Sequence, residues 1–158
     1  MANTQSMCTS FLGELMTATH NFGTAPTRAT SAADTFKAAL YLTSATVNAS
    51  TTAYSATGEV TGTNYSAGGT TITNATPPAS TNSSSTAGVG YWTPSASITY
   101  TNVTLSTAFD SVLVYNSTQS NKAVSVHTFG SQTITAGNFT LTMPSNTTTT
   151  ALLRLSTT

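Results

Sequence analysis

The chain has 158 residues, enough for one domain with its own hydrophobic core, and only 5% of them are charged, with a net charge of zero. A typical soluble domain has about 25% charged residues, so little electrostatic repulsion keeps two copies of this chain apart. The four scattered basic residues argue against a nucleic acid partner, the absence of a long apolar run argues against a membrane span, and the single cysteine excludes a disulfide framework.

The first predicted element is an amphipathic helix at residues 5–20. One apolar stripe recurs along it at helical spacing, made of Met7, Phe11, Leu12, Leu15 and Met16. This stripe must pack either on the β body of its own chain or on a neighbouring subunit. In the second case residues 1–33 form a helical docking arm with a linker, and residues 34–158 form a separate β domain. We expect the arm to bind its partner through Phe11, Leu12, Leu15 and Met16.

The next segments are predicted from turn residues and from alternation of apolar side chains. Residues 24–34 have the composition of a linker, and residues 35–43 alternate as a strand with one buried face. Weaker patterns predict a helical turn at 50–54, a bend at 58–62 and a strand at 70–76. Residues 77–90 are of low complexity and are expected to form an exposed loop.

From residue 89 onward the strand pattern is steady. Strands are predicted at 89–93, 95–105 with a bulge near Thr101 and Asn102, 109–115, 122–129 and 151–155. Residues 132–135 and 139–143 are predicted to form a hairpin across a turn at 136–138. Eight or nine short strands indicate a mainly β fold, an antiparallel β-sandwich or jelly-roll-like body preceded by one helix.

Few side chains in this chain can perform acid–base or metal chemistry. Glu14 and His20 lie six residues apart, a spacing that does not place them on one helical face. His127 with Asp110 and a serine could form a triad only by chance, since no nucleophile-elbow motif is present. Glu59 and Asp110 are the one credible carboxylate pair for a glycosidase, and Glu59 is better suited to bonding a bend backbone. We therefore expect no catalytic residue, metal or cofactor.

Aromatic side chains leave a sugar-binding alternative open. Four of them cluster in the predicted strands: Tyr91, Trp92, Tyr100 and Tyr115. They could present a platform for a carbohydrate, or they could be core residues whose polar ends stay hydrogen-bonded. The second reading is favoured.

Three segments resemble a family of small structural proteins encoded by tailed bacteriophages: 34–42 (DTFKAALYL), 54–69 (YSATGEVTGTNYSAGG) and 134–144 (ITAGNFTLTMP). The likeness covers most of residues 34–155, and its most specific part is 54–69. The resemblance implies a virion component, in the head or the tail, and brings no catalytic residues with it.

Composition and resemblance together lead to one preferred hypothesis. The chain is expected to be a capsid decoration or cement protein, made in the host cytoplasm and carried in the virion. Its partners would be the major capsid protein or other virion subunits, together with further copies of itself, and not nucleic acid or a membrane. The alternatives are a tail, fibre or connector component, and a small carbohydrate-binding β-sandwich module.

Overall fold

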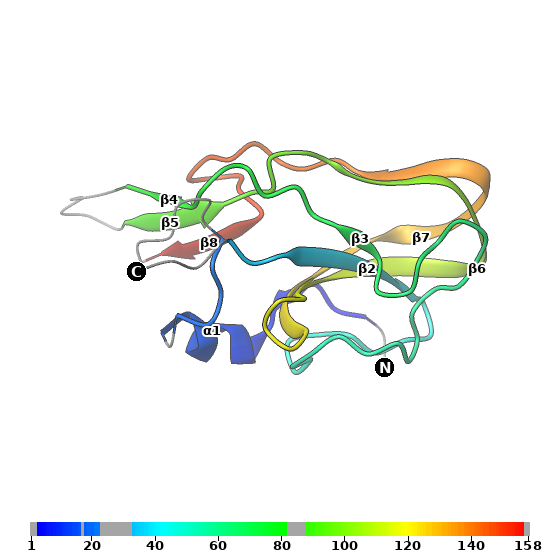
Figure 1. Cartoon of the computed structure of the whole chain (residues 1–158), viewed down its shortest axis with the longest axis horizontal. Helices are drawn as coiled ribbons and strands as arrows, with labels where there is room; N and C mark the ends of the chain where they lie inside the picture. The colour runs from blue at the N-terminus through cyan, green and yellow to red at the C-terminus, as the bar shows by residue number, and fades with distance from the viewer. Residues whose placement is uncertain (1–2, 17, 23–32, 82–87, 157–158) are drawn as a thin grey trace.

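The computed structural model describes residues 3–16, 18–22, 33–81 and 88–156. In this part the chain is mainly β, with two antiparallel sheets and one short helix, which confirms the predicted β-sandwich-like fold class (Figure 1). The elements are β1 (Ser6–Met7), α1 (Thr9–Met16), β2 (Phe36–Leu42), β3 (Thr70–Thr71), β4 (Ala79–Ser80), β5 (Val89–Trp92), β6 (Ile98–Asn116), β7 (Lys122–Leu141) and β8 (Leu153–Ser156). The larger sheet has the order β1-β7-β6-β2-β3, and the smaller has the order β4-β5-β8.

Strands β6 and β7 form one long antiparallel ribbon that bends back over the rest of the larger sheet (Figure 1). The near half of the ribbon consists of residues 109–116 paired with 122–128, and its β6 strand also pairs with β2. The far half consists of residues 98–105 paired with 134–141, and it covers the near half. Phe109 of the near half packs edge-on against Phe139 of the far half, with ring centroids 5.1 Å apart. The two layers of the sandwich are therefore largely two halves of the same ribbon.

The predicted hairpin at 132–143 is wrong, because both of its arms belong to the single strand β7. Ala136 does adopt a left-handed conformation (φ 45°), but its backbone N–H donates to Thr104 Oγ1 at 3.0 Å instead of closing a turn. On the partner strand Asn102 (φ 50°) donates its N–H to Asn138 Oδ1 at 2.8 Å, at the predicted bulge. Turn-forming residues in a long ribbon thus make bulges that increase its twist and bend.

Strand β2 is buried on both faces, not on one face as predicted. Its Phe36 and Leu40 lie in the core on one side, and on the other side Tyr41 is also buried. Tyr41 donates its hydroxyl to the carbonyl of Ser55 at 2.5 Å, because the chain after β2 folds back over this second face. The burial of Tyr41 depends on a loop whose path no local pattern predicts.

The N-terminal helix is shorter than predicted. Ser6 and Met7 pair with Val126 and Ser125 of β7, so that the helix begins only at Thr9. After α1 the chain turns at Ala18 (φ 54°). In this structure Phe11 and Leu15 of α1 pack on their own chain, as in the first of the two alternatives raised by the sequence, whereas Leu12 is exposed.

Phe22 anchors the segment that follows the helix. Its ring stacks on Phe36 of the larger sheet at 4.3 Å and packs at 4.7 Å against Trp92 of the smaller sheet. The side-chain amide of Asn74 donates to the carbonyl of Phe22 and accepts from Trp92 Nε1, which secures the same junction. The N-terminal segment thereby connects the two sheets.

Two loop predictions need correction, and two segments lie outside the described residues. No helical turn forms at 50–54, where Ala53 instead makes a β-bridge with Lys122. Within the predicted loop 77–90, strand β4 pairs with β5, while residues 82–87 are not described. Most of the predicted linker at 24–34 also falls outside the description, so the predicted boundary between residues 33 and 34 stays a prediction.

Candidate functional site

A buried polar network joins α1 to the β body. Glu14 of α1 accepts a hydrogen bond from His20 Nε2 at 2.7 Å and binds Lys122 Nζ at 2.6 Å. The two residues do not share a helical face, and they meet because the helix ends at Met16 and the chain turns at Ala18 before His20. Partial burial alone would raise the pKa of Glu14, but the hydrogen bonds and charges of Lys122 and His20 lower it below its ordinary value.

The same network continues into the core through Asn116. Its side-chain N–H₂ donates to His20 Nδ1 at 3.1 Å and to Asp34 Oδ2 at 2.7 Å. The two ring nitrogens of His20 thus have one partner each, Glu14 at Nε2 and Asn116 at Nδ1. Each of these polar groups has a protein partner, so the network is suited to holding the N-terminal segment in place. Among the described residues no three histidine, cysteine or acidic side chains are grouped as metal ligands.

Glu59 forms a second buried centre, inside the segment 54–69. Its carboxylate, in a residue only 7% exposed, accepts hydrogen bonds from the hydroxyls of Tyr54 and Tyr65 at 2.7 and 2.8 Å. The backbone N–H of Gly68 donates to the same carboxylate at 2.8 Å, so Glu59 does bond the backbone as expected. The Tyr65 hydroxyl also accepts from the N–H of Leu40, which ties this loop to β2.

Tyrosine hydroxyls surround Glu59, and each of them stays protonated. Burial raises the pKa of Tyr41 and of Tyr115 to about 12, and it raises that of Tyr54 and Tyr65 further. Such hydroxyls act as hydrogen-bond donors and not as bases. The predicted partner carboxylate, Asp110, lies elsewhere and accepts from Asn3 Nδ2 at 2.6 Å. The motif at 54–69 therefore holds a loop against the sheet.

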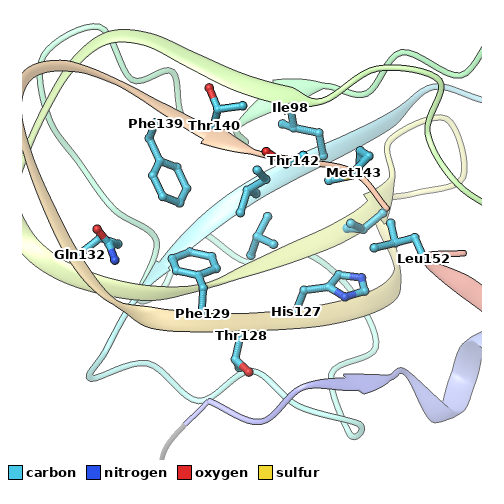
Figure 2. A pocket seen from close by; sticks show the side chains of 13 residues that line it. Ile98, His127, Thr128, Phe129, Gln132, Phe139, Thr140, Thr142, Met143 and Leu152 are labelled. Atoms are coloured by element: carbon cyan, nitrogen blue, oxygen red, sulfur yellow. The ribbon is translucent and has the colours of Figure 1, made fainter. Parts of the chain in front are cut away.

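A cleft of about 270 Å³ opens between the near and far halves of the ribbon (Figure 2). Phe129 and Phe139 point into it from the two halves, and His127 lies on its near wall (Figure 2). His127 Nε2 is 2.9 Å from the hydroxyl of Ser125, which is itself only 1% exposed. This hydroxyl is inaccessible and Asp110 is bonded to Asn3, so in the described part of the chain Ser125, His127 and Asp110 do not form a triad.

Burial lowers the pKa of His127 to about 4, from 6.5 for a free imidazole. Between these two pH values the imidazole of His127 is protonated in the unfolded chain but not in the folded chain. The free energy of unfolding therefore decreases as the pH falls from about 6.5 to about 4. We expect His127→Gln, which can still bond Ser125, to remove this part of the pH dependence. Urea unfolding of both proteins across this range checks it, because all other titrating groups cancel in the difference. Parallel pH profiles would show that His127 is solvated.

A second, apolar groove of about 170 Å³ lies between α1 and the smaller sheet. It is lined by Met7, Phe11, Leu15, Phe22, Pro78, Ala79, Gly90, Tyr91, Trp92, Leu153 and Leu155. Leu12 is 46% exposed and Leu155 is 43% exposed, and they are the exposed large hydrophobic residues of the described chain. In the described part of the chain, the exposed large apolar side chains therefore lie on α1 and β8.

The four predicted partner-binding residues have different environments. Phe11 is only 2% exposed and contacts His20, with ring centroids 4.9 Å apart, so it belongs to the core of its own chain. Leu12 points to solvent, and Leu15 is half-buried at the groove. Met16 lies in α1, and its side chain is outside the description. The sequence analysis did not name Leu155 as a candidate partner-binding residue. Its position in a short predicted strand, at 151–155, was the signal that could have identified it.

The aromatic residues considered for sugar binding are mostly internal. Trp92, Tyr100 and Tyr115 are each at most 5% exposed, and the Tyr100 hydroxyl donates to the carbonyl of Ala38 at 2.7 Å. Only Tyr91 is half-buried. A stacking platform needs open ring faces. Trp92, Tyr100 and Tyr115 are core residues with hydrogen-bonded polar ends, which was the favoured reading.

No family model, curated protein or solved structure matches the chain. No helix in the described residues is long and apolar enough to cross a membrane. The geometry and the composition of the surface are therefore the basis for the functional argument.

Proposed function

We propose that this chain is a structural subunit of a bacteriophage particle, a decoration or cement protein that docks on the major capsid protein. The observation that carries the proposal is the exposed Leu12 of α1, next to the half-buried Leu15, on a chain with only eight acidic and basic residues. A surface with so few charges does little to oppose association, so an exposed leucine on a fixed helix is a suitable contact for a partner subunit. The assignment agrees with the resemblance to phage structural proteins inferred from the sequence segments 34–42, 54–69 and 134–144, which remains a prediction.

The architecture favours docking because the binding surface is held rigidly. The bonds of Glu14 to His20 and Lys122 secure α1, and Phe22 is wedged between the two sheets. A preorganised surface loses little conformational entropy on association, so a modest apolar contact yields useful affinity. Repetition of that contact over a shell of identical sites multiplies its stabilising effect on the particle.

The number of copies per particle tests the location. We would purify the virions and measure the amount of this chain relative to the major capsid protein by quantitative gel densitometry. A ratio near one, or a simple fraction of it, is expected for a head decoration protein. A ratio of a few per cent would place the chain in the tail or at a vertex, and its absence from particles would overturn the proposal.

Leu12→Asp tests the docking surface directly. The substitution places a charge where we expect apolar contact, on a side chain that contributes little to the fold, so stability should change by only about 0.5 kcal/mol. Occupancy on particles assembled with the variant is expected to fall strongly. Ser131→Asp adds the same charge at an exposed position of β7 and should leave occupancy unchanged. Equal occupancy of the two variants would contradict a role for α1.

A variant of Phe11 is unsuitable for this test. The side chain is buried in the monomer, and removing a buried phenylalanine costs about 3–5 kcal/mol. Loss of occupancy in such a variant would report unfolding and not a lost contact.

A further inference from the structure

Strand β8 forms an edge of the smaller sheet, and the direction of its backbone groups can be derived. The N–H and the carbonyl of Val89 both bond to Thr81, on the β4 side of β5. In an antiparallel ladder alternate residues point to opposite sides, so Gly90 and Trp92 face β8. Their partners Leu155 and Leu153 therefore point their backbone groups toward β5. It follows that the N–H and carbonyl groups of Arg154 and Ser156 point outward.

This outward edge is open. In the described part of the chain no backbone hydrogen bond reaches the outward groups of Arg154 and Ser156, and both residues are exposed. Natural edge strands are usually protected by proline, a bulge, or charges that block pairing. The sequence Leu-Arg-Leu-Ser has no proline, and its register with β5 is unbroken. The one charged side chain, Arg154, is directed to the carbonyl of Thr148 at 3.3 Å.

We propose that β8 pairs antiparallel with β8 of a second copy of this chain, about a two-fold axis at Leu155. An extended strand matches the spacing of these outward backbone groups and can bond to them in register. Two features select a second copy: the chain has no net charge to repel itself, and the edge carries an exposed leucine that is its own best complement. The result is one continuous sheet of six strands, with β4, β5 and β8 from each copy.

The register follows from the backbone directions and from charge. With the axis at Leu155, Arg154 of each copy lies opposite Ser156 of the other, and these outward-facing residues exchange backbone hydrogen bonds. The two Leu155 side chains then form a non-hydrogen-bonded pair, the arrangement in which opposite side chains are closest. With the axis at Arg154, two guanidinium groups would face each other, which is unfavourable.

The proposed pairing uses residues of β8 and none of α1, so we expect a dimer to present two α1 surfaces. If the proposed function holds, the dimer is bivalent and can bridge two capsid subunits with higher avidity than a single copy. The dimer itself does not depend on that function. Leu12→Asp should therefore lose particle occupancy and remain dimeric, which separates failure of one proposal from failure of the other.

Light scattering coupled to size-exclusion chromatography of the purified full-length chain tests the pairing. We expect twice the monomer mass in the micromolar range, and the monomer mass for Ser156→Pro, which removes an outward N–H without touching the bonds to β5. Leu155→Asp should also be monomeric, because two like charges would meet on the axis. Ser156→Ala keeps the N–H and should remain dimeric. A monomeric wild-type chain, or dimers that persist in the proline and aspartate variants, would overturn the proposal.

Cysteine cross-linking tests the register. In a non-hydrogen-bonded pair the two Leu155 Cα atoms lie within about 4.5–5.5 Å, which suits a disulfide, so oxidised Leu155→Cys should form a covalent dimer. Arg154→Cys is the matched control, because its two copies would lie beyond the ~7 Å limit for bridging. The native Cys8 will not interfere, since it is fully buried and burial raises its pKa to about 11. Equal cross-linking of both variants would overturn the proposed axis.

Discussion

Replacing Gly69 by alanine is expected to lower the free energy of unfolding by about 3–5 kcal/mol, among the largest effects of a single substitution. Gly69 has a φ of +71°, and a Cβ atom there would lie 1.7 Å from the carbonyl oxygen of Ala38. The clash is with backbone, so it can be relieved only by moving β3 away from β2. Urea unfolding followed by the fluorescence of Trp92, the single tryptophan, measures the change.

Gly130→Ala is the control for this experiment. A Cβ atom at Gly130 would meet nothing within 4 Å, and Gly130 is not among the residues with positive φ. Its free energy of unfolding should stay within about 0.5 kcal/mol of the wild type. Equal stability of the two alanine variants would contradict the placement of the 66–69 turn close to β2.

Removing the Glu59 carboxylate is the second change with a large expected effect. In Glu59→Leu the hydroxyls of Tyr54 and Tyr65 and the N–H of Gly68 lose their shared acceptor. Each buried donor left without a partner costs about 1–3 kcal/mol, so a total loss of roughly 3–5 kcal/mol is expected. Thermal unfolding gives the loss, and near-ultraviolet circular dichroism of the tyrosines reports the local repacking.

Glu59→Gln separates lost hydrogen bonds from lost volume. The amide has the same shape, keeps an acceptor for Tyr65 and Gly68, and can donate to the Tyr54 hydroxyl. We expect it to lose clearly less stability than Glu59→Leu. If the leucine variant were the more stable of the two, burial of the carboxylate would cost more than its bonds return, as happens for some buried charges.

Both predictions concern one segment, residues 54–69. Tyr54, Glu59, Tyr65, Gly68 and Gly69 all contribute to one loop that is bonded to itself and to β2. The residues of segment 54–69 therefore stabilise the fold. The surface proposed for docking lies on α1, and the edge proposed for self-association lies on β8, both outside the motif.

Several features were predictable because they depend on residues close together in the chain. Alternation of apolar side chains located β2, and the terminal apolar run located β8. Asn102, a residue type that tolerates positive φ, was correctly associated with a bulge. The same local reasoning failed at Ala136, since a left-handed residue serves a turn or a bulge equally well and only the partner strand distinguishes them.

The sequence by itself determined the mainly β class, most strand positions, the low charge and the apolar stripe of the N-terminal helix. Only the tertiary structure decided that β6 and β7 are continuous and folded over, that Phe11 is buried while Leu12 is exposed, and that His20 returns to Glu14. The physical reason is that side-chain period is a local property, whereas burial and pairing depend on segments far apart in the chain. The exposed face of α1 and the outer edge of β8 are surfaces that those distant contacts do not cover.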